Sequence, residues 1–413
     1  MRVMYVSASP QLGGAEASLA DLLASVRAVQ PDWPLHLVVP GPGPLERRAA
    51  ALGVSTIIVP LGSLIARLSE RGTSERPARL HARMAFAAAH ALVYIGRLRR
   101  VIREVQPAIL HTNGLKVHLL ASWADSGPPL VWHLHDYLGS RATSARLLRS
   151  SRNRCAVVLA PSRSVARDAE AALGIANVVT VPNAVDLQRF SPCGDRLDLD
   201  RLAGLDGAPP GAVRIGLLAT FARWKGHATF LRAIACLPRS LPIRAYVLGG
   251  PLYGTVGSEY SLQELKLLAN QLGIQDRVGF TGFIERPDAA LRSLDVVVHA
   301  STEPEPFGLV IAEAMASVRP VIVSLAGGAA EWVTPGVDCL AHTPGDTEGL
   351  ASRIAELSRD AALRGRLGRA GRSTAERAFD RERLARDLLP IYQSVVDPRR
   401  ATEDRAVNKE TRM

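Results

Sequence analysis

The sequence predicts an α/β protein with two doubly wound domains, and three observations lead to this prediction. The chain has 413 residues, more than one hydrophobic core usually serves. Hydrophobic residues make up 47% and charged residues 22%, as in globular proteins. Short apolar, β-branched runs alternate with longer helical stretches, which indicates parallel sheets covered by helices on both faces.

The predicted strands fall into two groups. The first group lies at 3–6, 35–39, 56–59, 108–111, 130–134, 157–160 and 178–181, and the second at 213–218, 244–248, 278–281, 296–299, 321–324 and 339–341. A polar, turn-rich stretch separates the groups. We therefore expect domains at 1–188 and 189–380 that face each other across a cleft, a terminal helix at 381–397 and a disordered tail at 398–413.

The formal net charge of +11 comes almost entirely from arginine. Only four of the 50 basic residues are lysines, so 46 are arginines, a skew that codon bias explains as well as function does. A DNA or RNA binder remains an alternative, but no known nucleic-acid module and no aromatic-rich basic stripe supports it, so we expect no nucleic-acid partner. In such a chain Lys225 is a rare choice that suggests a chemical role.

Four cysteines without zinc-site spacing are expected to be buried or inert thiols in a reducing compartment. The N-terminus has no export leader, so we expect a cytoplasmic protein. The apolar run 84–96 is too short to cross a bilayer. It predicts either a domain helix with solvated ends or a basic amphipathic helix resting on anionic lipid.

Ligands of open parallel sheets bind beyond the carboxyl ends of the strands. In the second half the loops at these ends are rich in glycine and charge, as expected around a phosphate-bearing ligand. They are 219–226, 249–250, 282–283, 301–308 and 326–328.

The segment 301–315 carries two carboxylates, Glu305 and Glu313, eight residues apart. On a continuous helix this spacing is roughly 12 Å of rise, too far for a shared metal or an acid/base dyad unless the loop before the helix folds back. A helix starting near Phe307 or Gly308 would offer free N–H groups to an anion between the carboxylates. A sugar nucleotide, with hydroxyls at both ends and a diphosphate between, has the matching shape.

This segment resembles the retaining glycosyltransferases of family 4, whose Glu-x7-Glu motif reads Glu-Pro-Phe-Gly-Leu-Val followed by Glu-Ala-Met. The resemblance extends over most of the chain, through Gly13-Gly14-Ala15-Glu16, the segment 181–186 with Ala184 in place of the usual glycine, Lys225-Gly226, and Gly327-Gly328 followed by Glu331. It implies the GT-B fold with Rossmann-like domains and the C-terminal helix packed back on the first domain.

The resemblance implies a role for each candidate residue. Glu313 would hold ribose hydroxyls and Glu305 sugar hydroxyls, while Lys225 and Arg223 neutralise the diphosphate; Thr220 stands where the family has an arginine. Further donor contacts are expected from Gly13, Gly14, Gly249, Gly250, Phe283, Phe307, Gly308 and Leu309. His135 would lie near the transferred sugar, and Glu16, His111, Asn113 and Asp136 are acceptor-side candidates. A structural histidine capping a loop remains the alternative for His135 and for His111.

The sequence thus predicts a retaining, metal-independent hexosyltransferase without a cofactor. It would move a hexose from a UDP- or GDP-linked sugar to a hydroxyl of a glycan or lipid-linked acceptor in cell-surface polysaccharide or glycolipid synthesis, and weak docking on the inner face of an anionic membrane is a secondary expectation. The alternatives are a GT-B epimerase, a phosphorylase-like enzyme and a non-catalytic nucleotide-sugar-binding subunit.

Overall fold

A computed structural model of the chain describes residues 1–62, 77–124, 127–176, 178–251 and 258–397. The chain divides into two compact units, Met1–Asn183 with the segment from Arg381 onward, and Ala184–Asp380. The division after Asn183 falls a few residues before the boundary expected at 188. The tail expected to be disordered, 398–413, lies outside the described residues.

The described part of the first unit contains a seven-stranded parallel sheet in the order β3-β2-β1-β4-β5-β6-β7. Its strands are β1 Val3–Ser7, β2 Leu35–Val39, β3 Ser55–Ile58, β4 Ile109–Asn113, β5 Leu130–His133, β6 Cys155–Ala160 and β7 Val179–Thr180. Its helices are α1 Gly14–Val29, α2 Pro44–Ala51, α4 Pro77–Val105, α5 Leu115–Ala124, α6 Ala142–Ser151, α7 Arg163–Leu173 and α15 Glu382–Val396. The predicted doubly wound fold is confirmed for this unit.

The described part of the second unit contains a six-stranded parallel sheet in the order β10-β9-β8-β11-β12-β13. Its strands are β8 Val213–Leu218, β9 Ile243–Leu248, β10 Val278–Gly282, β11 Val296–His299, β12 Val321–Ser324 and β13 Leu340–His342. Its helices are α8 Leu199–Ala203, α9 His227–Ala235, α10 Leu262–Gln271, α11 Pro287–Arg292, α12 Leu309–Ala316, α13 Thr347–Arg359 and α14 Ala361–Ala378.

Local sequence signals explain where several helices begin and end. α10 starts with a capping box in which the Ser261 side chain and the Glu264 side chain each bond the other's backbone N–H. α7 starts at Ser162, whose hydroxyl accepts a bond from Val165 N, and ends at Gly174 in the left-handed conformation. The Ser162 cap starts α7 three residues after the end of β6, so the connection between this strand and its helix is short.

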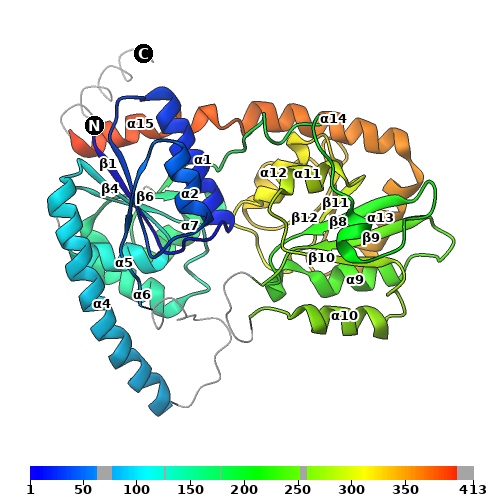
Figure 1. Ribbon diagram of the computed structural model, residues 1–413, viewed down its shortest axis with the longest axis horizontal. Coiled ribbons are helices and arrows are strands. Elements are labelled where there is room, and N and C mark those ends of the chain that lie inside the picture. The colour runs from blue at the N-terminus through cyan, green and yellow to red at the C-terminus, as the bar shows by residue number, and fades with distance from the viewer. Residues whose placement is uncertain (63–76, 125–126, 177, 252–257, 398–413) are drawn as a thin grey trace. The chain divides into compact units, whose positions relative to one another are not determined.

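The C-terminal helix α15 packs against α1 on the first unit, as predicted (Figure 1). Its apolar stripe is buried, and Tyr392 is fully enclosed. The backbone N–H of Ala385 donates to Ser25 Oγ at 2.9 Å, and Arg383 bonds the carbonyls of Pro182 and Asn183. α15 is therefore part of the first unit's core.

Many arginines bond main-chain carbonyls at or near the carboxyl ends of helices. Examples are Arg27 to Leu52 O, Arg99 to Ala124 O, Arg149 to Ala172 O, Arg277 to Leu237 O and Arg372 to Ala316 O. A cation there satisfies carbonyls that lack an intrahelical donor and is favoured by the helix dipole. The arginine surplus thus has a structural use that composition did not suggest.

The apolar run 84–96 lies inside α4, whose side chains are described from Ala88 onward. Tyr94, Ile95 and Leu98 are buried, whereas Leu92 and Val93 are 70% and 54% exposed. No helix in the described ranges is long and apolar enough to span a bilayer.

The four cysteines differ in burial. Cys339 is buried and Cys155 is partly buried, whereas Cys193 and Cys236 are exposed, which leaves the inert-thiol alternative for these two. Neither lies within a predicted strand, where periodicity would have indicated its environment.

Candidate active site

In the second unit Lys225 and Glu305 meet at the carboxyl ends of β8 and β11. Lys225 Nζ lies 2.9 Å from Glu305 Oε1 and 2.8 Å from Oε2, so the ammonium bridges both carboxylate oxygens. The Glu305 residue is 7% exposed, and the Lys225 side chain is 21% exposed. The structure therefore brings together two residues, eighty positions apart, that the sequence predicted for one site.

A glycine makes this meeting possible. Gly226 has φ of +77°, and a Cβ there would lie 1.8 Å from the carbonyl oxygen of Ala300. The loop after β8 can therefore reach the loop after β11 only without a side chain at this position. The backbone N–H of Thr302 then donates to Trp224 O at 2.7 Å and joins the two loops.

The Glu305 carboxylate is surrounded by donors. Besides Lys225, Ser301 Oγ donates to Oε2 at 2.9 Å and His299 Nε2 lies 3.2 Å from the same oxygen. Burial acts to raise the pKa of Glu305, but the charge of Lys225 and the hydrogen bonds from His299 and Lys225 outweigh it and hold the pKa well below its usual range. Glu305 is therefore an anion that only accepts hydrogen bonds.

His299 and Ser301 were not predicted from the sequence. His299 is the last residue of β11, and its side chain is buried with Nδ1 unpartnered among the described residues. The sequence did contain one indication, because His299 is the single polar residue at the end of an otherwise apolar strand.

The helix that carries Glu313 starts as predicted. α12 begins at Leu309 after Gly308, which has φ of +85°. Phe307 and Gly308 are buried, and Leu309 and Glu313 are partly buried. Glu305 and Glu313 thus flank the start of α12, as the spacing indicated.

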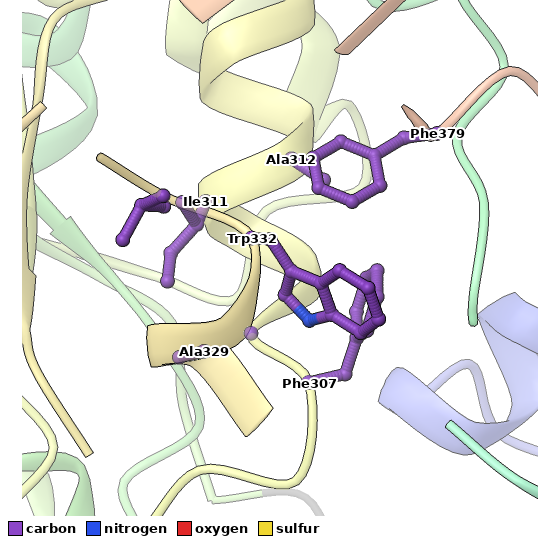
Figure 2. A pocket seen from close by; sticks show the side chains of 8 residues that line it. Phe307, Ile311, Ala312, Ala329, Trp332 and Phe379 are labelled. Atoms are coloured by element: carbon purple, nitrogen blue, oxygen red, sulfur yellow. The ribbon is translucent and has the colours of Figure 1, made fainter. Parts of the chain in front are cut away.

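Aromatic packing fixes this helix start (Figure 2). The Phe307 ring centroid lies 5.6 Å from those of Trp332 and Phe379, and the three rings line a narrow apolar pocket with no room for a water molecule. We interpret the pocket as packing that holds the Phe307-Gly308 turn, because it offers too little space for a ligand.

Arg223 is not brought to the carboxylate of Glu305. Its guanidinium pairs with Glu264 at 2.7 Å and lies over the Tyr260 ring at 4.3 Å, with both charged side chains nearly half exposed. Lys225 and Arg223 share one short turn, but in this structure only Lys225 contacts Glu305.

Three further predicted donor contacts, Gly249, Gly250 and Phe283, lie at the ends of β9 and β10. Gly249 has φ of +143°, and a Cβ there would lie 1.9 Å from Ala219 O, which holds the ends of β8 and β9 together. A Cβ on Gly250 would lie 3.7 Å from that of Phe283. The Phe283 side chain is 58% exposed, which leaves its ring available for stacking.

In the first unit Asn113 connects the ends of three elements. Its Nδ2 donates to Ala15 O in the first turn of α1 at 3.2 Å, and its Oδ1 lies 2.6 Å from His135 Nε2 beyond β5. A carbonyl can only accept, so the first bond fixes the amide orientation. Oδ1 must therefore accept from His135 Nε2–H, which leaves the lone pair of neutral His135 on Nδ1.

Glu16 lies in the first turn of α1, after Gly13 at the helix N-cap and Gly14. The Glu16 side chain is 95% enclosed, and its Oε2 has no hydrogen-bond partner among the described residues. Burial raises its pKa to about 7, against two backbone hydrogen bonds that lower it. Asp136, by contrast, is partly exposed and paired with Arg141 at 3.0 Å.

The two histidine candidates differ. His135 is partly buried at the strand end, and burial together with neighbouring histidines lowers its pKa to about 3. His111 is fully buried, and its Nδ1 lies 2.7 Å from Tyr392 Oη. His111 therefore lies inside the core within β4, and not in a loop, as the structural alternative for it had supposed.

Comparison with known families decides the assignment. The model of Glycosyltransferase Family 4 matches residues 12–189, and that of Glycosyl transferases group 1 matches 207–374. This chain belongs to glycosyltransferase family 4.

Relatives of this chain include a lipopolysaccharide core biosynthesis glycosyltransferase of Rhizobium meliloti, 30% identical over 50% of this chain and 57% of the relative. A D-inositol 3-phosphate glycosyltransferase of Xylanimonas cellulosilytica is 32% identical over 54% of this chain and 52% of the relative. The matched regions span about half the length of these curated relatives. The structure of Anabaena HepE in complex with UDP and glucose superposes with a TM-score of 0.78 at 22% identity, over 95% of this chain and 100% of that one. The GT-B fold expected from the sequence is thereby confirmed.

Proposed function

We propose that the protein is a retaining hexosyltransferase. It moves a hexose from a UDP- or GDP-linked sugar to a hydroxyl of a glycan or lipid-linked acceptor in cell-surface polysaccharide or glycolipid synthesis. The observation that carries the proposal is the Lys225–Glu305 pair beside the start of α12. The names of the relatives support a sugar donor and a glycan acceptor, since they include lipopolysaccharide core transferases and a neighbour crystallised with UDP-glucose.

Charge neutralisation drives the proposed donor chemistry. Lys225 and the N–H groups at the start of α12 stabilise the charge that develops on the departing diphosphate. Arg223 joins them by leaving Glu264, an exchange that costs little because exposed ion pairs contribute about 0 to 1 kcal/mol. These cations take the place of a divalent ion, so the proposed reaction is metal-independent.

Glu305 and Glu313 hold the two ends of the donor in this proposal. Glu305, ionised by its donors, accepts hydrogen bonds from sugar hydroxyls, and Glu313, about one turn into α12, accepts from the ribose. Phe283 and the Gly249-Gly250 turn contact the base. The acceptor hydroxyl attacks the face from which the nucleotide leaves and gives its proton to the departing phosphate.

On the acceptor side, His135, Asn113 and Glu16 provide hydrogen-bonding groups without a permanent cation. The lone pair on His135 Nδ1 accepts a hydroxyl hydrogen, and the unpartnered Glu16 oxygen offers a second contact. Asp136, tied to Arg141, borders the same loop.

The test begins with donor binding. Thermal unfolding with a panel of UDP-, GDP- and ADP-sugars should show one donor that raises Tm, and Lys225→Ala should abolish the shift, whereas Arg239→Ala, which breaks an exposed ion pair elsewhere in the unit, should not.

Release of nucleoside diphosphate that requires acceptor distinguishes transfer from epimerisation. A product with inverted anomeric configuration would contradict the retaining assignment, and donor binding without turnover would favour a non-catalytic subunit.

We also propose weak docking on an anionic membrane through α4. Exposed Leu92 and Val93 lie about one turn before Arg97 and about two turns before Arg100, which suits a helix lying on anionic lipid. Vesicles containing phosphatidylglycerol should sediment the protein and neutral vesicles should not, and Leu92→Glu should reduce binding. Equal binding to both kinds of vesicle would exclude this role.

A further inference from the structure

A chain of buried phenol and imidazole groups crosses the first unit beneath α15. Tyr392 Oη lies 2.7 Å from His111 Nδ1 and 3.4 Å from Tyr5 Oη. His111 Nε2 lies 3.3 Å from His133 Nδ1. The chain joins α15, β1, β4 and β5, and each member is at most 2% exposed.

The protons of this chain allow two ordered arrangements. Burial raises the pKa of both phenols and lowers the pKa of both imidazoles, so each group carries one hydrogen. Either Tyr392 donates to His111 and His111 to His133, or each bond runs the other way. The two arrangements differ at the far end, where His133 Nε2 carries a hydrogen in one and a lone pair in the other.

That far end adjoins the acceptor-side histidine. The rings of His133 and His135 are 4.4 Å apart between centroids, and His133 pairs in the sheet with Asn113, which holds His135 Nε2. His133 Nε2 is buried and has no partner among the described residues. An unsatisfied buried nitrogen lowers the stability of the fold, so leucine or valine at position 133 would be more stable if the residue served only to fill the core.

We propose that Tyr392 is a positioning residue for His135 and acts through His111 and His133. The hydroxyl of Tyr392 holds His111, His111 holds the His133 ring, and the ordered His133 ring packs against His135 and keeps it in a single orientation toward the acceptor. This inference rests on the proposed transfer activity. It gives the C-terminal helix a part in the reaction although Tyr392 touches no substrate.

A mutant cycle with a matched control tests the kinetic side. Tyr392→Phe should lower kcat by about tenfold and leave the donor KM within about twofold, whereas Tyr94→Phe, another buried tyrosine of the same unit, should change neither. His133→Phe keeps a ring against His135 but breaks the chain. Tyr392→Phe added to His133→Phe should then cost nothing further, and effects that multiply would overturn the proposal.

Nitrogen-15 NMR of histidine-labelled protein tests the same chain without any turnover. The sequence has ten histidines, and His135→Gln assigns the signal in question. In the wild type, His111 and His133 should each show one neutral tautomer, and Tyr392→Phe should shift or broaden the signals of His111, His133 and His135.

A change confined to His111 would refute the proposal. If the wild type transfers no sugar, the proposed function fails, yet the spectra still decide whether Tyr392 orders His135.

Discussion

At the scale of single residues, the site depends on a partly exposed ammonium, Lys225, in contact with a buried carboxylate, Glu305. Lys225 is one of only four lysines, and Glu305 is ionised despite its burial. Removing one member of the pair leaves the other without its counter-charge. We therefore expect single variants of Lys225 or Glu305 to lose activity and stability together. An experiment must separate them.

Paired substitutions achieve this separation. Lys225→Met alone should destabilise the protein by about 3 kcal/mol, because it leaves a buried carboxylate unpaired. Adding Glu305→Gln should restore most of that stability, while sugar transfer stays at least about a hundredfold below wild type. Urea unfolding and initial rates of nucleoside diphosphate release measure the two effects. If the double variant recovered activity together with stability, the Lys225–Glu305 pair would have only a structural role.

Arg223 permits a milder comparison. Its exposed pair with Glu264 should contribute less than about 1 kcal/mol, so Arg223→Ala should unfold like Arg239→Ala. If Arg223 turns to the diphosphate, its removal should raise the donor KM or lower kcat by about tenfold, whereas Arg239→Ala should leave both unchanged. Identical kinetics in the two variants would remove Arg223 from the site.

The sequence predicted some of these residues and missed others for a physical reason. Lys225, Glu305, Asn113 and His135 follow strands, so the rule of carboxyl strand ends located them. The Tyr392 contact with His111 joins positions 281 residues apart through packing of α15, and no local pattern encodes such a distance. Arg223 lies only two residues before Lys225 in the sequence, but its side chain points to Glu264 and pairs with it, and the sequence does not encode that side-chain direction.

At the scale of elements, the loops after β8 and β9 depend on glycines that let backbones touch. Strand positions were predictable because apolar runs mark them, and β8 was predicted to the residue. Close approach between loops was not predictable, because it depends on where Ala300 O and Ala219 O lie in space.

Two glycine substitutions measure this approach. Gly226→Ala combines a left-handed backbone with a steric clash against Ala300 O, and should cost about 3 kcal/mol or more. Gly273→Ala has nearly the same φ, +66°, but no atom closer than 3.9 Å to the new Cβ, and should cost about 1 kcal/mol. Urea unfolding compares them. Equal costs would mean that the loop moves without penalty.

At the scale of the whole molecule, buried titratable groups are divided unevenly between the units. His111, His118, His133 and His135 all have lowered pKa values in the first unit, whereas the second has His227, at about 4, and His342. A histidine kept neutral by folding gains its proton on unfolding. Each therefore lowers stability as pH falls below about 6.5, by at most about 1.4 kcal/mol per pH unit.

The first unit should accordingly be the more sensitive to acid. Glu16, with its pKa raised to about 7, binds a proton in the folded state, so it gains stability as the pH falls. This gain offsets the stability lost through about one of the histidines. Glu305, with its pKa lowered, costs stability only below about pH 4. Limited proteolysis between pH 6.5 and 5 should cleave the first unit first and leave fragments within 184–380. Simultaneous cleavage of both units would contradict this expectation.

The contacts of arginine with helix carbonyls also affect the response to salt. A guanidinium bound to a carbonyl is a charge facing a dipole, and it keeps its full charge toward solvent ions, unlike one bound to a carboxylate. Dissolved salt screens the attraction between charges that are more than about 10 Å apart, the Debye length at 0.1 M salt. It hardly weakens the bond between a guanidinium and a carbonyl in direct contact. Retention on a cation-exchange column should therefore fall steeply with ionic strength while the unfolding midpoint stays nearly constant, so that salt could lift the protein from an anionic surface without loosening its fold.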